Sequence, residues 1–107
     1  MSTRKIKRKQ PETFERAAES TSFILHALGY KHLRARVVGK SVVIESGPAR
    51  DPLPHARLMH LADEEWRIDF PKPSGRWQIT PYTGFRGNLV AEIHQNAPWM
   101  LKPHAGG

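Results

Sequence analysis

Residues 66–80 read WRIDFPKPSGRWQIT, and this stretch decides the fold. On both sides of the central PKPSG segment, large apolar residues alternate with polar ones, as in strands that bury one face. With KPSG as the loop, Phe70 lies opposite Trp77. Ile68 then lies opposite Ile79, and both apolar rows share one face because side chains alternate along a strand. We therefore predict a β-hairpin with one buried face, around which the other elements pack.

A helix and a second hairpin precede this stretch. Pro11 suits a first helical turn, Gly29 suits a C-terminal cap, and apolar residues recur between them at helical spacing. We therefore predict a helix over residues 11–28. Residues 33–46 predict a hairpin with a type II′ turn at Gly39 and Lys40. Its register pairs Val37 with Val42 and Ala35 with Ile44 on one face, and Arg36 with Val43 and Arg34 with Glu45 on the other.

A short second helix is predicted after the hairpin of residues 66–80. Asn88 is suited to cap its N-terminus, and Pro98 prevents the helix from continuing past about Asn96. Its apolar side carries Leu89, Val90, Ile93 and Ala97. The apolar cluster that follows either folds back onto the core or stays exposed for a partner, and consists of Trp99, Met100 and Leu101.

The order of these elements predicts an α+β fold. With a further strand over residues 55–61, we expect an N-terminal helix, an antiparallel sheet of about five strands and a short C-terminal helix. Both helices should lie on one face of the sheet. A chain of 107 residues forms one domain. We expect a disordered basic tail over residues 1–10, a single compact domain over residues 11–101 and a flexible C-terminus over residues 102–107.

Positive charge is concentrated at the N-terminus. The chain has 17 Lys and Arg against 10 Asp and Glu, which gives a net charge of +7. Five of these cations and no acid lie in residues 1–10, namely Arg4, Lys5, Lys7, Arg8 and Lys9. Such a segment buries too little surface to offset its ordering entropy, so we expect it to be mobile and available to nucleic acid.

The two hairpins also predict a basic face on the side of the sheet away from the helices. By alternation this face carries Arg34, Arg36, Arg67 and Arg76 together with His60, and its acids are Glu45 and Asp69. Arginine forks match phosphate geometry, so the face is a candidate nucleic-acid surface. A purely structural interpretation pairs Arg34 with Glu45 and Arg76 with Asp69. Arg36 and Arg67 then have no evident acidic partner.

The sequence shows no motif for catalysis, metal binding or a cofactor. It has no cysteine, which excludes disulfides and thiolate zinc sites, and it has no His-x-x-x-His pair. His55 and His60 are five apart on a strand, so they should point to opposite faces. We therefore expect no catalytic residue, no metal site and no cofactor, which favours a binding protein over an enzyme.

The order of helix, sheet and helix resembles that of double-stranded-RNA-binding domains. HicA-type toxin ribonucleases are similar in this order, and residues 70–93 here show a comparable strand, turn and closing helix. Their histidine after a Gly-Ser turn is missing, since the nearest match here is Gly39-Lys40-Ser41-Val42. No catalytic residue therefore carries over from the resemblance.

These observations favour a small non-enzymatic protein that binds DNA or RNA, or a nucleic-acid-bound complex, through its basic tail and outer arginines. The first alternative is a protein-interaction module, such as a phage- or plasmid-encoded inhibitor or regulator, whose contact is the sheet edge or the cluster of Trp99, Met100 and Leu101. The second is a small endoribonuclease toxin that uses His60 or His94 as its acid-base group. Each hypothesis is compatible with a homodimer.

The sequence also favours a cytoplasmic location without a membrane partner. No apolar run approaches the roughly 20 residues of a membrane-spanning helix, and the N-terminus lacks the apolar core of a signal peptide. The absence of cysteine agrees with a reducing compartment, and we expect both ends to be original termini.

Overall fold

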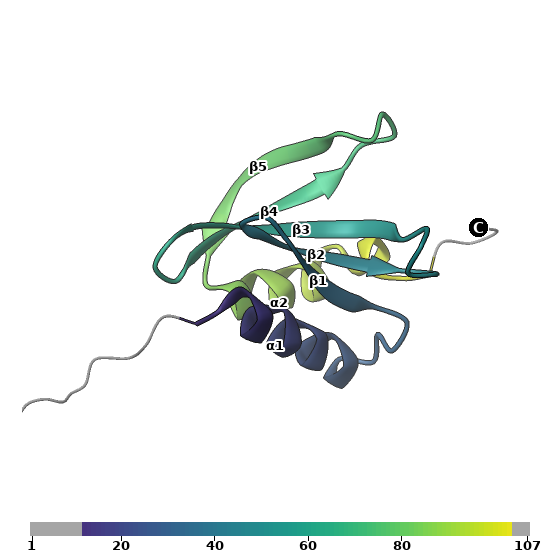
Figure 1. The fold of residues 1–107 in the computed structure, drawn as a ribbon, viewed down its shortest axis with the longest axis horizontal. Helices are drawn as coiled ribbons and strands as arrows, with labels where there is room; N and C mark the ends of the chain where they lie inside the picture. The colour runs from purple at the N-terminus through teal and green to yellow at the C-terminus, as the bar shows by residue number, and fades with distance from the viewer. Residues whose placement is uncertain (1–11, 104–107) are drawn as a thin grey trace, which may run out of the picture.

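Two helices pack on one face of a five-stranded antiparallel sheet (Figure 1). The structure is a computed structural model, and it describes residues 12–103. The strands lie in the order β1-β2-β3-β4-β5, so neighbours in the sheet are also neighbours in sequence. The elements are α1 (Phe14–Ala27), β1 (Arg34–Val38), β2 (Ser41–Ser46), β3 (Leu53–Ala62), β4 (Glu65–Pro71), β5 (Trp77–Gly84), α2 (Arg86–Asn96) and the 3-10 turn η2 (Pro98–Met100).

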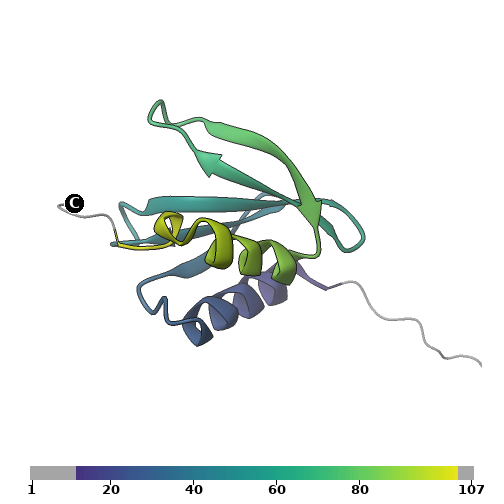
Figure 2. The ribbon, with the colours of Figure 1, turned by 180° about the vertical axis from the view of Figure 1, so that it is seen from behind.

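The predicted α+β architecture is confirmed. The view from behind again shows α1 and α2 on the same side of the sheet (Figure 2), where they contact each other and the strands. We call the opposite side of the sheet the outer face. Neither of the two described α-helices combines the length and hydropathy needed to cross a lipid bilayer.

The first helix is capped at both ends by its own sequence. The Thr13 hydroxyl accepts a hydrogen bond from the Arg16 amide at 3.1 Å, so α1 begins at Phe14, later than predicted. At the other end Gly29 has a φ of +102°. The Tyr30 amide donates to the Leu25 carbonyl at 2.9 Å, which completes a Schellman motif. The predicted cap at Gly29 is confirmed, whereas Pro11 lies outside the described residues.

The hairpin of β1 and β2 forms in the predicted register. Arg36 lies opposite Val43, and Val37 lies opposite Val42. Gly39 has a φ of +59°, as the first central position of a type II′ turn requires. Because Val42 is fully buried against the helices, Arg36 and Val43 belong to the outer face.

The hairpin of β4 and β5 forms, but the predicted register is wrong by one residue. The Lys72 amide bonds to the Arg76 carbonyl at 2.8 Å, and Gly75 has a φ of +89°. The loop is therefore three residues, 73–75, with a left-handed glycine at its end, rather than the four residues expected. Phe70 consequently lies opposite Gln78, and Ile79 lies opposite Asp69.

This one-residue shift moves the β5 side chains to the other face. Ile79 is 57% exposed, and Trp77 is only partly buried, so the prediction that both lie in the core is wrong. On β4 the prediction is confirmed, because Trp66 and Ile68 are buried. The main core instead lies between the helices and the central strands, and includes Leu25, Leu33, Val42, Ile44, Ala56, Leu58, Leu89, Val90, Ile93 and Leu101.

The C-terminal segment differs from the prediction at its start. Phe85, not Asn88, occupies the N-cap position of α2, and it makes no side-chain capping bond. The apolar cluster after the helix divides between two environments. Leu101 is fully buried and Met100 packs against the core, whereas Trp99 is 67% exposed.

Candidate nucleic-acid interface

Cross-strand pairing brings arginine and apolar side chains into rows on the outer face. One row crosses all five strands and contains Arg36, Val43, Arg57, Asp69 and Ile79. The neighbouring row contains Val38, Ser41, Met59, Arg67 and Thr83. Two buried carboxylates organise the arginines of this face into two clusters.

The first cluster forms around Glu45, whose side chain is only 2% exposed. Arg36 reaches both carboxylate oxygens, from Nε to Oε2 and from Nη2 to Oε1, each at 3.0 Å. Arg34 donates from Nε to Oε2 at 3.1 Å and from Nη1 to the Gly47 carbonyl at 2.6 Å. The hydrogen bond to Glu45 stabilises the charged guanidinium and raises the pKa of Arg36.

The second cluster forms around Asp69, whose side chain is completely buried. Arg57 donates to Asp69 Oδ2 from Nε at 3.0 Å and from Nη2 at 2.8 Å. Arg67 donates to Oδ1 from Nε at 2.8 Å and to Oδ2 from Nη2 at 3.0 Å. Burial raises the pKa of Asp69, but the hydrogen bonds and positive charges of Arg67 and Arg57 together lower it more, so the net shift is downward.

Each cluster carries one positive charge in excess, because two guanidinium groups share one carboxylate. The prediction that Arg36 and Arg67 lack an acidic partner is wrong, whereas the pairing of Arg34 with Glu45 is confirmed. Arg57, which the sequence did not single out, takes the position beside Asp69 that had been assigned to Arg76. Arg36 and Arg34 remain 53% and 37% exposed, so the Glu45 cluster presents guanidinium groups to solvent, whereas Arg57 and Arg67 on Asp69 are only 17% and 20% exposed.

A shallow groove of about 460 Å³ lies on the outer face between two of these arginines, Arg36 and Arg57, and Trp77. The guanidinium carbon of Arg57 lies 4.8 Å from the centroid of the Trp77 ring, a cation–π contact. Apolar side chains provide much of the lining, including Val43, Pro54 and Met59. Among the described residues that line the groove, the carboxylate is Glu45 and the cations are Arg36, Lys40 and Arg57.

His60 lies on the helix side, so its predicted place on the outer face is wrong. Its ring centroid is 4.9 Å from that of Trp66 and 5.6 Å from that of Phe14 on α1. His60 Nε2 donates to the Asp63 carbonyl at 2.7 Å, which closes the turn between β3 and β4. His60 therefore belongs to the packing between the sheet and the start of α1.

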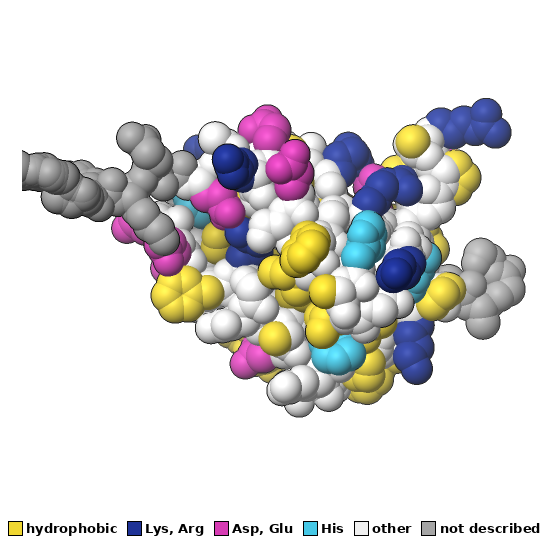
Figure 3. All heavy atoms as spheres, turned by 90° about the horizontal axis from the view of Figure 1, so that it is seen from below, with side chains coloured by type: hydrophobic (Ala, Val, Ile, Leu, Met, Phe, Trp, Pro, Cys, Tyr) yellow, Lys and Arg dark blue, Asp and Glu magenta, His cyan; other side chains and the backbone are white. Residues whose placement is uncertain are grey.

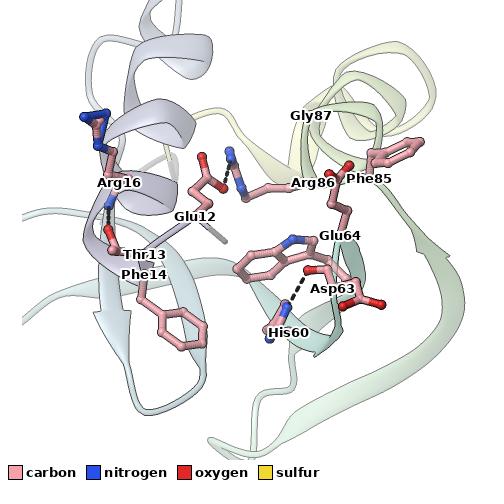
Figure 4. A pocket seen from close by; sticks show the side chains of 11 residues that line it. Glu12, Thr13, Phe14, Arg16, His60, Asp63, Glu64, Phe85, Arg86 and Gly87 are labelled. Atoms are coloured by element: carbon pink, nitrogen blue, oxygen red, sulfur yellow. Dashed lines mark hydrogen bonds and ion pairs between the residues drawn. The ribbon is translucent and has the colours of Figure 1, made fainter. Parts of the chain in front are cut away.

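A second pocket of about 890 Å³ opens beside His60, between the start of α1, the β3–β4 turn and the start of α2 (Figure 4). Arg86 crosses it and donates to Thr21 Oγ1 at 3.0 Å and to Glu12 Oε1 at 2.6 Å, which ties the two helices together. Carboxylates and cations are mixed in its lining: Glu12, Asp63 and Glu64 against Arg16 and Arg86. This mixture of charges favours neither an anionic nor a cationic ligand.

Two further histidines, His32 and His55, hold backbone carbonyls of the C-terminal turn. His32 Nε2 donates to the Leu101 carbonyl at 2.7 Å, and His55 Nδ1 donates to the Met100 carbonyl at 2.9 Å. His55 therefore faces the helix side like His60, contrary to the prediction, because a bulge shifts the β2–β3 register beside it. The hydroxyl of Tyr30 lies 2.8 Å from His94 Nδ1.

The described residues on the helix side carry charged side chains of both signs (Figure 3). Seen from below, this side shows carboxylates and cationic side chains together with exposed apolar and histidine side chains (Figure 3). Within residues 12–103, no three His, Asp or Glu side chains gather where they could hold a metal ion. Comparison with known proteins found no matching family model, no similar curated protein and no similar solved structure.

Proposed function

We propose that this protein binds nucleic acid through the outer face of its sheet together with its basic N-terminal residues. The observation that carries the proposal is the sharing of each buried carboxylate, Glu45 and Asp69, by two arginines. This arrangement fixes guanidinium groups at the surface with an excess of positive charge. Guanidinium forks held in this way lose less side-chain freedom when they bind phosphate oxygens.

Stability alone is a weaker explanation of the two clusters. A buried ion pair usually stabilises a fold no more than well-packed apolar residues of the same volume would. Four arginines on one face are therefore better explained by a ligand that needs their charge. A further carboxylate that alternation places on this face, Glu65, lies at the start of β4 beside the β3–β4 turn and is not part of the groove lining.

The basic segment of residues 1–10 would add affinity without sequence specificity. Its five cations are known from the sequence, and the segment lies outside the described residues. If all five engaged duplex DNA, the logarithm of the binding constant would fall with the logarithm of salt concentration at a slope of roughly 4 to 5. The outer face would set the register of the nucleic acid, and the segment would strengthen the contact.

Co-purification tests this proposal without assuming DNA or RNA. The full-length protein, purified at low salt, should carry nucleic acid that raises its absorbance at 260 nm relative to 280 nm. Nuclease treatment should remove this excess, and a variant without residues 1–10 should carry less. The proposal fails if the low-salt protein carries no nucleic acid and also shows only millimolar-range association with added DNA and RNA.

One observation favours a protein-interaction module as the second candidate. Trp99 is 67% exposed, although the residues beside it pack against the core and Leu101 is fully buried. A fixed, exposed tryptophan is a common anchor at protein interfaces. A Trp99→Ala variant that loses a partner but keeps nucleic-acid binding would support this candidate.

A further inference from the structure

The shape of the outer face bears on which kind of nucleic acid it can bind. The β4–β5 hairpin curls away from the rest of the sheet on the side opposite the helices (Figure 1). Trp77 begins β5 and lines the groove on that side, while Arg36 on β1 lines it from the other. The outer face is thus a concave surface with an aromatic ring toward one edge and cations toward the other.

The floor of this groove is apolar. Val43 and Met59 occupy neighbouring rows of the outer face, and both line the groove. Ile79 lies further along the row of Val43, beyond Arg57 and Asp69, and is a separate exposed apolar side chain outside the groove lining. A phosphate backbone would leave such a floor unused, whereas the flat face of a base would cover it.

A duplex cannot place its bases on this floor. Strands about 4.8 Å apart make a five-stranded sheet about 19 Å wide, and the major groove of B-DNA is about 12 Å wide. The outer face could therefore touch a duplex only along its phosphates. A single strand can turn its bases toward the protein and stack them on aromatic side chains or guanidinium planes.

We propose that the groove binds single-stranded nucleic acid, with a base stacked beside Trp77 and Arg57 and the backbone held by Arg36 and Lys40. This inference rests on the proposed function and narrows its ligand. The Arg57 guanidinium already lies over the Trp77 ring at 4.8 Å, so the two groups form a preformed stacking surface. The positive charge of the groove favours a single strand over an apolar partner. Among the described residues that line it, the one carboxylate is Glu45, and two arginines already pair with it.

Tryptophan fluorescence in full-length protein tests the stacking contact. A Trp99→Phe background removes the exposed tryptophan, and Trp66 is buried, so changes on binding report mainly on Trp77. Oligothymidylate of about 12 nucleotides, within the usual site size for single strands, should quench this emission. Because these variants lack the reporting tryptophan, the anisotropy of a labelled oligothymidylate measures their binding: Trp77→Ala should weaken it roughly 5- to 150-fold, whereas Trp77→Phe should retain most of it. Circular dichroism melting checks that both variants fold.

Competition separates failure of this inference from failure of the proposed function. A duplex of the same length should displace the oligonucleotide at least about tenfold less well, because it cannot cover the apolar floor. Equal competition by the duplex, or unchanged binding by Trp77→Ala, overturns the single-strand assignment and leaves nucleic-acid binding intact. Absence of binding to either form overturns both. Preferential binding of polyglutamate overturns both and assigns the groove to an acidic peptide.

Discussion

Arg67 and Asp69 lie two residues apart on β4, and the Arg67 Nε is 2.8 Å from Asp69 Oδ1. Residues two apart on a strand share a face, so the pair lies side by side on the outer face. Asp69 is completely buried there, whereas Arg67 remains partly exposed. The carboxylate thus acts as an internal support for Arg67 and, from the next strand, for Arg57.

Removing the charge of Asp69 should destabilise the protein. In Asp69→Asn, the guanidinium groups of Arg57 and Arg67 lose a shared charged acceptor, and the free energy of unfolding should fall by about 3 kcal/mol. Denaturant unfolding measures the change. Glu65→Gln on the same strand removes an exposed carboxylate and should change stability by less than about 0.5 kcal/mol. Equal stability of the two variants would show that the Asp69 cluster is not a structural support.

The lowered pKa of Asp69 predicts that the protein loses stability in acid. The pKa of Asp69 is lower in the folded than in the unfolded protein. The ionised carboxylate therefore stabilises the fold fully above the unfolded pKa, near 4, and this stabilisation is lost as pH falls through the folded pKa. The urea midpoint of the wild type should therefore drop as pH falls below about 4. Asp69→Asn should drop less over the same range. If the urea midpoints of the two proteins fell in parallel with pH, the lowered pKa of Asp69 would be contradicted.

The observed register of β4 and β5 gives opposite expectations for two isoleucines. Ile68→Ala removes a buried side chain and should cost about 2 to 5 kcal/mol. Ile79→Ala removes one that is largely exposed and should cost less than about 1 kcal/mol. Denaturant midpoints decide between the two registers. In the register with a four-residue loop, both side chains would be buried, and both variants would be strongly destabilised.

The C-terminal turn gives a similar pair of predictions, one for a buried and one for an exposed side chain. Leu101→Ala should lower the free energy of unfolding by about 2 to 5 kcal/mol, because the Leu101 side chain is fully buried. His32 and His55 hold the turn in place through the carbonyls of Leu101 and Met100. Trp99→Ala should stay within about 0.5 kcal/mol. Thermal melts of the two variants provide the measurement, and a mild effect of Leu101→Ala would mean that the turn does not pack onto the core.

Local chemistry explains why some elements could be predicted. The turn at Gly39 admits two residues, so the register of β1 and β2 follows from the sequence. The segment PKPSG admits loops of three or four residues, and the choice between them reverses the faces of β5. Sequence alone also supplied no register between β2 and β3, where a bulge intervenes, so Arg57 and its contact with Asp69 were not predicted.

The charge of the outer face can be tested most directly by salt-dependent binding. Arg36→Gln with Lys40→Gln removes the two groove cations that are proposed to hold the nucleic-acid backbone, and it leaves Arg34 on Glu45. Arg16→Gln with Lys31→Gln removes two exposed cations from α1 and the loop after it, as a control of equal charge.

Fluorescence anisotropy of a labelled single-stranded oligonucleotide at several salt concentrations compares these variants with the wild type. We expect the outer-face variant to bind more weakly and to reduce the salt slope by about 1.4, since each phosphate contact on a single strand contributes about 0.7. The control should match the wild type closely. Equal loss of affinity and slope in both variants would contradict binding by the outer face and leave only non-specific attraction to net charge.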